Sequence, residues 1–192
     1  MADLFVEILG KPHGFIVFQL LAACRFTIYL SLIAFVGGGA IACLITLLRI
    51  SKIPSLQGFA TTFIWVFQSI PLLMLLFLIG LGMPRLLDVN VDPWTAATFA
   101  LVLFTAAYLA EVWRGAIESV ARGQWEASYA LNIRYSLLLR DVILPQAIKF
   151  GVAPTIGFMV QIIKGTSLAY IIGFNDLMLV GKRWANAPVL GS

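Results

Sequence analysis

The amino-acid sequence predicts an all-α integral membrane protein. Of its 192 residues, 61% are hydrophobic and only 11% are charged, and the mean hydropathy is +0.97. A soluble domain of this size has no means of burying so much apolar surface. The apolar residues gather in segments of about 20 residues or more, the length that a helix needs to cross a lipid bilayer. We therefore expect about four spanning helices.

The first apolar segment, residues 15–48, is longer than a single span requires. It follows an N-terminal lead-in of mixed composition, residues 1–14. We expect an interfacial piece followed by the first span, with Arg25 near the junction. The glycines at 37–39 either let another helix approach closely or loosen the helix locally, and both interpretations stay open.

A short basic loop, from Arg49 to Lys52, precedes the second expected span, residues 61–81. Under the positive-inside rule this loop is cytoplasmic, so we expect the N-terminus to lie outside. Pro71 lies within the second span and removes one backbone hydrogen bond, which predicts a break at residues 69–71. Broken helices in transporters usually line a cavity, because freed backbone groups cannot face lipid.

The third expected span, residues 94–113, has tryptophan at both ends, as is typical at membrane interfaces. The fourth covers residues 151–172 and leaves the last residues outside, although Lys182 and Arg183 are a weak contradiction to that placement. Between the two spans lies a polar, basic insert, residues 122–145, which we expect in the cytoplasm.

The insert is expected to contain two short helices. Residues 124–131 are good helix formers, with Glu126 in the first turn, where a carboxylate suits the helix dipole. Asn132 follows, and asparagine accepts the left-handed conformation that often ends a helix. We therefore expect a second helix over about 134–141 that meets the first at an angle, with Pro145 closing the insert.

This order of residues resembles the cytoplasmic loop of ABC importer permeases, in which Glu-Ala-Ala precedes a glycine and a later Ile-x-Leu-Pro. The matching residues here are Glu126, Ala127, Ser128, Asn132, Val142, Leu144 and Pro145. Ser128, Asn132 and Val142 depart from the pattern, but Asn132 keeps the backbone property of the glycine. TAAYLAEVWRGAI at 105–117, KGTSLA at 164–169 and VFQSIPLL at 66–73 are similar to the polar amino acid branch of that family, so the resemblance covers about residues 26–177.

The resemblance implies a type I ABC importer permease-like helical bundle, with two short cytoplasmic coupling helices added to the spans. The permease domain would cover residues 15–192 and lie in the inner (plasma) membrane of a bacterial cell as a multi-pass protein. Permeases of this type usually end with a further helix. Because no apolar run of that length follows Phe174, we expect the family's final helix to be missing.

The same resemblance implies partners and roles. A separate ATPase dimer would grip the insert, bind ATP and Mg, and drive the transport of a polar or charged amino acid. An extracytoplasmic amino acid-binding protein and a second permease chain, the same or similar, are also expected. The ATPase-coupling residues would be Gly123, Glu126, Ala127, Ser128, Asn132 and Arg134.

Ionisable side chains within the expected spans are the candidate substrate-binding residues, because a charge in a membrane must pair or face water. Glu111 and Arg114 share one helix face and are either a substrate contact or a structural pair at the interface. Lys164 lies in the fourth span, between Gln161 and Ser167, and its partner is either the substrate carboxylate or Glu111. Together these five side chains offer both signs of charge to a zwitterion.

Several other kinds of chemistry lack their residues in this sequence. It has no GxxxxGK[ST] phosphate loop, no nucleophile with a base and no metal cluster, so we expect no enzymatic activity, no catalytic residue and no cofactor in this chain. Basic residues beside the spans indicate membrane orientation and not nucleic-acid binding. Cys24 and Cys43 would be separated by roughly 28 Å of helix, too far for a disulfide.

Two other functions remain open. Half of an ion-coupled secondary amino acid transporter would explain the broken helix and Lys164, but it has no use for a long cytoplasmic insert. A non-transporting membrane assembly protein would not need an intramembrane lysine. Co-purification of an ATPase distinguishes all three functions.

Overall fold

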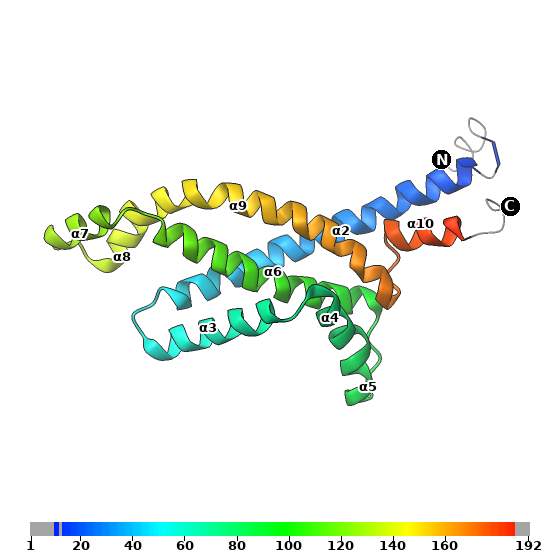
Figure 1. Cartoon of the computed structure of the whole chain (residues 1–192), viewed down its shortest axis with the longest axis horizontal. Coiled ribbons are helices and arrows are strands. Elements are labelled where there is room, and N and C mark those ends of the chain that lie inside the picture. The colour runs from blue at the N-terminus through cyan, green and yellow to red at the C-terminus, as the bar shows by residue number, and fades with distance from the viewer. Residues whose placement is uncertain (1–9, 12, 187–192) are drawn as a thin grey trace. The chain divides into compact units, whose positions relative to one another are not determined.

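The structure, a computed structural model, describes residues 10–11 and 13–186, and the regular elements in these residues are all helical (Figure 1). The chain forms two units. Of the described residues, the first holds those up to 35, 71–102 and 162–186, and the second holds 36–70 and 103–161. Three long helices contribute to both units: α2 (His13–Arg49), α6 (Pro93–Glu118) and α9 (Leu144–Gly165).

The other elements are shorter. They are α3 (Pro54–Ser69), α4 (Leu72–Phe77), the π-helix η1 (Leu78–Gly82), α5 (Met83–Leu87), α7 (Arg122–Ala130), α8 (Tyr135–Leu137), the π-helix η2 (Leu138–Ile143), the 3₁₀-helix η3 (Thr166–Ile172) and α10 (Leu177–Ala185). Within the described residues, the stretches His13–Arg49, Pro93–Glu118 and Tyr135–Ile172 are each long and apolar enough to cross a membrane. The pair Pro54–Ser69 and Leu72–Leu87 makes a fourth span if it is counted as one broken helix, as the sequence predicts.

The first apolar segment is one continuous helix, α2, of 37 residues, and is not divided near Arg25. No proline interrupts its hydrogen-bond ladder beyond His13. At about 1.5 Å per residue α2 exceeds the roughly 30 Å of a hydrocarbon core, so its ends project beyond that layer. A Cβ on Gly39 would lie 3.8 Å from the ring of Trp113, which favours close helix approach as the role of this glycine.

The break in the second span is confirmed. α3 ends at Ser69, and Ile70 is extended, with φ −98° and ψ 119°. Pro71 follows with ψ 141°, before α4 begins at Leu72. A proline disfavours the helical conformation of the residue before it, and it lacks the N–H that the helix would need. The sequence therefore fixes this interruption locally.

In the second unit, α6 is contacted by three other helices through side-chain hydrogen bonds. Thr46 of α2 donates to the Ala110 carbonyl at 3.3 Å, Gln68 of α3 donates to the Ala107 carbonyl at 3.3 Å, and Trp113 Nε1 donates to Thr155 Oγ1 of α9 at 3.0 Å. Near the last of these bonds α6 and α9 approach closely, since a Cβ on Gly151 would lie 3.3 Å from that of Ala116. Small residues thus permit these helices to pack within the membrane.

In the first unit, the last span ends at a glycine. η3 ends at Ile172, and Gly173 then adopts φ +87°, a conformation that side chains with a Cβ disfavour. Trp94, at the start of α6, packs against Phe174 with the ring centroids 5.2 Å apart. Ile172 also lies so close to η1 that a Cβ on Gly80 would come within 2.9 Å of it. The span therefore terminates in a well-packed turn.

One expectation about the insert is wrong. The second short helix does not end near residue 141, because α8, η2 and α9 follow one another without a break and form one helical stretch from Tyr135 to Ile172. Pro145 lies inside this stretch and does not close the insert. A proline lacks the N–H that would bond the carbonyl of Asp141, and the preceding π-helical turn changes the bonding pattern there.

Candidate functional site

The helix α7 rests on an apolar cluster that also includes the adjoining ends of the spans. Buried in this cluster are Ile117 at the end of α6, Val120 just after α6, Leu138 and Ile143 of η2, and Ala147 of α9. Trp125 of α7 and Ile50 after α2 pack against it as partly buried residues. In Figure 1, α7 and α8 lie together beyond the ends of α6 and α9. A force on α7 is therefore passed through packed side chains to those helices.

Five of the six predicted ATPase-coupling residues are exposed. These are Gly123, Glu126, Ala127, Asn132 and Arg134. Ser128 is buried instead, at 4% exposure, and its hydroxyl donates to the carbonyl of Gln124 at 2.7 Å. The side chain of Ser128 thus packs toward the protein. The other five remain available to a partner.

The left-handed conformation predicted for Asn132 is confirmed, with φ +54°. The turn that follows brings the insert against the basic loop after α2. Tyr135 donates its hydroxyl to the carbonyl of Ile50 at 2.8 Å, and the ammonium group of Lys52 lies 4.5 Å from the centre of the Tyr135 ring. The two basic loops therefore lie at the same end of the second unit.

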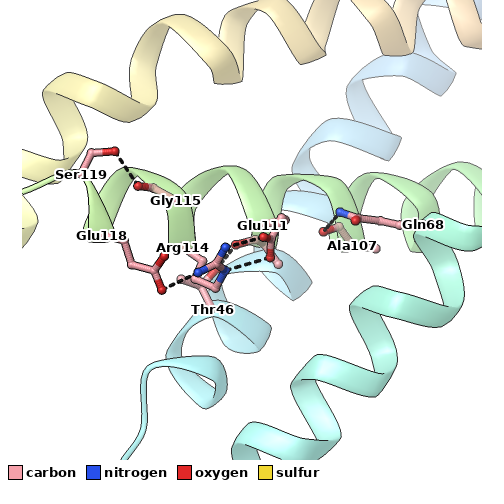
Figure 2. Close-up of polar contacts among 9 residues, drawn as sticks. Thr46, Gln68, Ala107, Glu111, Arg114, Gly115, Glu118 and Ser119 are labelled. Carbon is pink, nitrogen blue, oxygen red and sulfur yellow. Dashed lines mark hydrogen bonds and ion pairs between the residues drawn. The ribbon is translucent and has the colours of Figure 1, made fainter.

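Glu111 and Arg114 form part of an ion network on α6 that includes a third residue (Figure 2). Arg114 Nε donates to Glu111 Oε2 at 2.9 Å, and its Nη2 donates to Oε1 at 2.5 Å. Its remaining Nη1 pairs with Glu118, one turn further along α6. These contacts use three of the five N–H groups of the guanidinium, so one N–H on each terminal nitrogen is left for a ligand carboxylate.

The other predicted substrate residues lie near the end of α9. Gln161 and Lys164 are exposed, and Ser167 is half-buried and donates to the Lys164 carbonyl at 2.6 Å. The Lys164 ammonium has no hydrogen-bond or ion-pair partner in the part of the chain that the structure describes. Lys164 and Ser167 belong to the first unit, whereas Gln161, Glu111 and Arg114 belong to the second.

Three groups of residues at these sites are not among the predicted ones. Glu118 completes the ion network, and its position four residues after Arg114 is the signal that identifies it. Tyr129 and Leu131 are 53% and 74% exposed on the insert, where apolar side chains have no lipid to face if the insert lies in the cytoplasm. Asp176 is 1% exposed near a cavity, and only the fold reveals its burial.

Two cavities accompany these sites. One, of about 440 Å³ in the second unit, is lined almost wholly by apolar side chains of α2, α6 and α9. The other, of about 500 Å³ in the first unit, is lined by Lys164 and Ser167 together with residues of α2 and α10. Among the described residues, no group of three His, Cys, Asp or Glu side chains has the arrangement of a metal site. Cys24 and Cys43 are both free thiols.

Comparisons with known proteins point to one kind of function. The family described as "binding-protein-dependent transport system inner membrane component" matches residues 38–190. The probable amino-acid ABC transporter permease protein YckA of Bacillus subtilis (strain 168) is 35% identical over 157 residues, which are 82% of this chain and 69% of that protein. The L-cystine transport system permease protein TcyB of the same organism is 35% identical over 167 residues, or 87% of this chain and 68% of that protein. A crystal structure of an amino acid ABC transporter with histidines superposes with a TM-score of 0.84 at 29% identity, over 89% of this chain and 79% of that chain.

Proposed function

This chain belongs to the family of inner membrane components of binding-protein-dependent transport systems, and from that premise we propose that it is the permease subunit that carries a polar or charged amino acid into a bacterial cell. The names of YckA and TcyB support the substrate class. A separate ATPase dimer binds ATP and Mg and supplies the energy. An extracytoplasmic binding protein delivers the amino acid, and a second permease chain, the same or similar, completes the path.

The exposed surface of α7 and the turn after it is the docking site for the ATPase. One observation carries this assignment: Leu131 is 74% exposed and Tyr129 is 53% exposed beside the polar residues Glu126 and Arg134. Large apolar side chains that lie outside the spans and beside charges are typical of a protein interface. Gly123, Ala127 and Asn132 leave room for a partner to approach the backbone.

Transport is coupled to ATP through the apolar cluster under α7. Closure of the ATPase dimer moves α7, and the movement passes through Trp125, Leu138 and Ile143 to the ends of α6 and α9. Because side chains in such a cluster are close-packed, α7 and the spans move together instead of sliding past one another. The movement then exposes the substrate residues alternately to the two sides of the membrane.

The test is charge reversal at Glu126. In Glu126→Lys the exposed carboxylate becomes a cation, so the tagged permease should retain at least about tenfold less ATPase on purification and lose ATP-dependent uptake of radiolabelled amino acids in proteoliposomes. Asp141→Lys is the matched control, since Asp141 is exposed on η2 and makes only a surface contact of 3.7 Å to Arg140. A Glu126→Lys protein that assembles and transports like the parent contradicts the docking assignment.

The same proposal places the insert and the Arg49–Lys52 loop in the cytoplasm and the N-terminus outside. It is supported by the contact between these two basic loops, through Tyr135 and Ile50. In a background without Cys24 and Cys43, a cysteine at Lys11 should react with a membrane-impermeant thiol reagent in intact cells. A cysteine at Gln124 should react only after the membrane is opened. The opposite pattern reverses the orientation.

The substrate contacts that we propose are Lys164, Gln161, Ser167, Glu111 and Arg114. Glu111 and Arg114 neutralise each other in the absence of a ligand, which allows two charges to remain within a span. A zwitterion would exchange its own charges for part of this network. Within residues 10–11 and 13–186 Lys164 has no such partner, so Lys164→Met is expected to reduce the uptake of every amino acid that the transporter carries while ATPase binding remains normal.

A further inference from the structure

The cavity of about 500 Å³ in the first unit is large enough for one amino acid. Its wall is formed by Thr27 of α2, by the end of α9 and the start of η3, and by one face of α10. Ile163, Leu177, Met178 and Ala185 form the apolar part of the wall. The polar side chains in the wall are Thr27, Lys164, Thr166, Ser167, Asp176 and Lys182.

Two oxygen atoms in this wall are buried and lack hydrogen-bond partners among the residues that the structure describes. Asp176 is 1% exposed, and its Oδ1 accepts a hydrogen bond from the Leu179 amide at 2.8 Å, whereas its Oδ2 accepts none. The hydroxyl of Thr27 is also shielded from solvent without a partner. Burial raises the pKa of the Asp176 carboxyl, because desolvation disfavours the charged form. An unsatisfied buried carboxylate oxygen is costly, and a cationic donor would remove that cost.

The same wall carries positive charge. Lys164 has no side-chain partner among the described residues, and Lys182 donates to the Tyr170 hydroxyl at 2.7 Å, with its ammonium 3.9 Å from the centre of that ring. Two lysines make the cavity a poor site for a bare metal cation, since they would repel it. They suit a carboxylate instead.

We propose that this cavity binds the main-chain groups of a zwitterionic amino acid, with the α-ammonium on Asp176 Oδ2 and Thr27 and the α-carboxylate on Lys164 and Lys182. This inference rests on the proposed function, and it adds Thr27, Asp176 and Lys182 to the substrate contacts. These contacts are made to main-chain groups that all amino acids share, so they do not select among side chains.

Access to Asp176 Oδ2 requires α10 to shift, and the contacts of α10 permit this. Within Leu177–Ala185 no residue is buried. The helix is held instead by the Asp176 cap, by the Lys182–Tyr170 contact and by a hydrogen bond of 2.8 Å from Trp184 to Gln19. A ligand that replaces the Lys182–Tyr170 contact with a charge-assisted one offsets the cost of the shift.

The experiment uses the purified permease in complex with its ATPase, without the binding protein. Radiolabelled uptake of the common L-amino acids by the wild-type transporter first identifies a substrate, and calorimetry then measures the binding of that substrate, of its N-acetyl derivative and of its α-carboxamide. Asp176→Asn keeps the cap and the size of the side chain but removes the charge. We expect it, and the isosteric Thr27→Val, to weaken substrate binding by about tenfold or more.

The two derivatives show which residues contact each end of the ligand, because the N-acetyl derivative lacks the α-ammonium and the carboxamide lacks the α-carboxylate. Wild-type protein should bind both derivatives poorly. In Asp176→Asn the N-acetyl derivative should bind as well as the substrate does. In the double variant Lys164→Met/Lys182→Gln the carboxamide should bind as well as the substrate does, because the charged partners of the altered group are already gone. Arg183→Gln is the control for Lys182→Gln, since Arg183 is the neighbouring cation on α10 but does not line the cavity.

The outcomes separate this inference from the function on which it rests. If Asp176→Asn and the double variant Lys164→Met/Lys182→Gln discriminate the two derivatives as the wild type does, the cavity is not the site, although the chain remains an amino acid permease. If the wild-type transporter takes up no amino acid, the proposed function itself fails. Loss of binding that is equal for Lys182→Gln and Arg183→Gln overturns the assignment of Lys182.

Discussion

The helices α7 and α10 each have nine residues, yet opposite kinds of contact fix them in place. α7 has no side-chain cap at its N-terminus, and it is held by Trp125 on an apolar cluster and by the buried Ser128. α10 buries no residue and is held by directional polar contacts that involve Asp176, Lys182 and Trp184. α7 is anchored mainly by packing, with one hydrogen bond of 3.3 Å from Gln146 to Gln124, and α10 mainly by hydrogen bonds.

This difference suits the two functions that we propose. A packed cluster is made of many weak contacts and resists deformation, so a helix that rests on it can transmit force to the spans. A set of separate hydrogen bonds, each contributing about 1 kcal/mol, can be exchanged for contacts with a ligand. α7 is therefore suited to coupling and α10 to covering a binding cavity.

The largest expected effect comes from removing part of the cluster under α7. Leu138 is fully buried, so Leu138→Ala leaves a cavity and should lower the free energy of unfolding by about 2–5 kcal/mol. Because α7 rests on this side chain, ATPase binding should weaken as well. Thermal unfolding of the purified permease in detergent measures the first effect, and co-purification measures the second.

The neighbouring residue provides the control. Leu137 is 47% exposed on α8, and Leu137→Ala should change the unfolding free energy by only about 0.5 kcal/mol or less. Equal losses of stability in Leu137→Ala and Leu138→Ala would mean that the cluster does not anchor the insert, and the contrast with α10 would then disappear.

A smaller effect follows from giving α7 the kind of cap that α10 has. Ala121 is the N-cap of α7 and supplies no side-chain hydrogen bond, whereas Asp176 caps α10. Ala121→Asp should stabilise α7 by about 1 kcal/mol, since the carboxylate accepts a backbone N–H and suits the helix dipole. Slower hydrogen exchange over residues 122–130 is the measurement.

The opposite end of α7 gives the matched reverse change. Ala130 is exposed in the last turn, and Ala130→Asp places the same charge at the negative end of the dipole, so exchange over α7 should become faster. If both substitutions leave exchange unchanged, packing alone determines the stability of α7.

Removing one polar contact of α10 should loosen that helix without affecting α7. The rings of Phe15 and Trp184 have centroids 6.0 Å apart, and Trp184→Phe keeps a ring against Phe15. The variant loses the hydrogen bond to Gln19, which should lower the free energy of unfolding by about 0.5–1.5 kcal/mol. Amide exchange over 177–185 should accelerate, and exchange over 122–130 should not change.

Gln19→Leu removes the same hydrogen bond from the other side. In the double variant Trp184→Phe/Gln19→Leu, the loss in the free energy of unfolding should therefore be smaller than the sum of the two single losses. Additive losses would show that Trp184 and Gln19 do not stabilise α10 through each other.

Much of the fold follows from local signals in the sequence. The apolar segments predict the spans, Pro71 predicts the break, and the left-handed Asn132 follows from its residue type. The structural match at a TM-score of 0.84 agrees with the predicted helical architecture. These features depend on hydrophobicity and backbone chemistry, both of which are properties of neighbouring residues.

The features that the sequence misses depend on packing between distant segments. The uninterrupted helix through Pro145 requires a π-helical turn whose Leu138 and Ile143 are buried in the cluster. The burial of Asp176 requires α10 to lie over its cavity, which no local pattern indicates. Glu118 is different, because its spacing of four residues from Arg114 on one helix face is itself a local signal.

The smallest expected effect concerns two aspartates whose pKa values are shifted in opposite directions. Burial raises the pKa of Asp176 above its ordinary value of 3.8, whereas hydrogen bonds from the side chain and backbone of Thr95 lower that of Asp92. Both residues lie outside the spanning helices, and both accept hydrogen bonds near the start of a helix.

The signs of the two stability effects are therefore opposite. The folded protein holds the Asp176 proton more tightly than the unfolded chain does. The contribution of Asp176 to the free energy of unfolding therefore falls as pH rises from 3.8 through its folded pKa. Asp92 contributes stability that is present above pH 3.8 and is lost as pH falls through its lowered pKa. Asparagine at either position removes the charge but keeps an acceptor for the helix N–H.

Thermal midpoints of the wild type, Asp176→Asn and Asp92→Asn across acid to neutral pH measure both effects. Relative to wild type, Asp176→Asn should become more stable as pH rises, and Asp92→Asn should become less stable. Addition of the transported amino acid should reduce the first difference, because an ammonium group beside Asp176 restores its charged form. The same pH dependence for both variants would mean that Asp176 is not held in a dehydrated site, and the view of α10 as a cover over a polar cavity would lose its support.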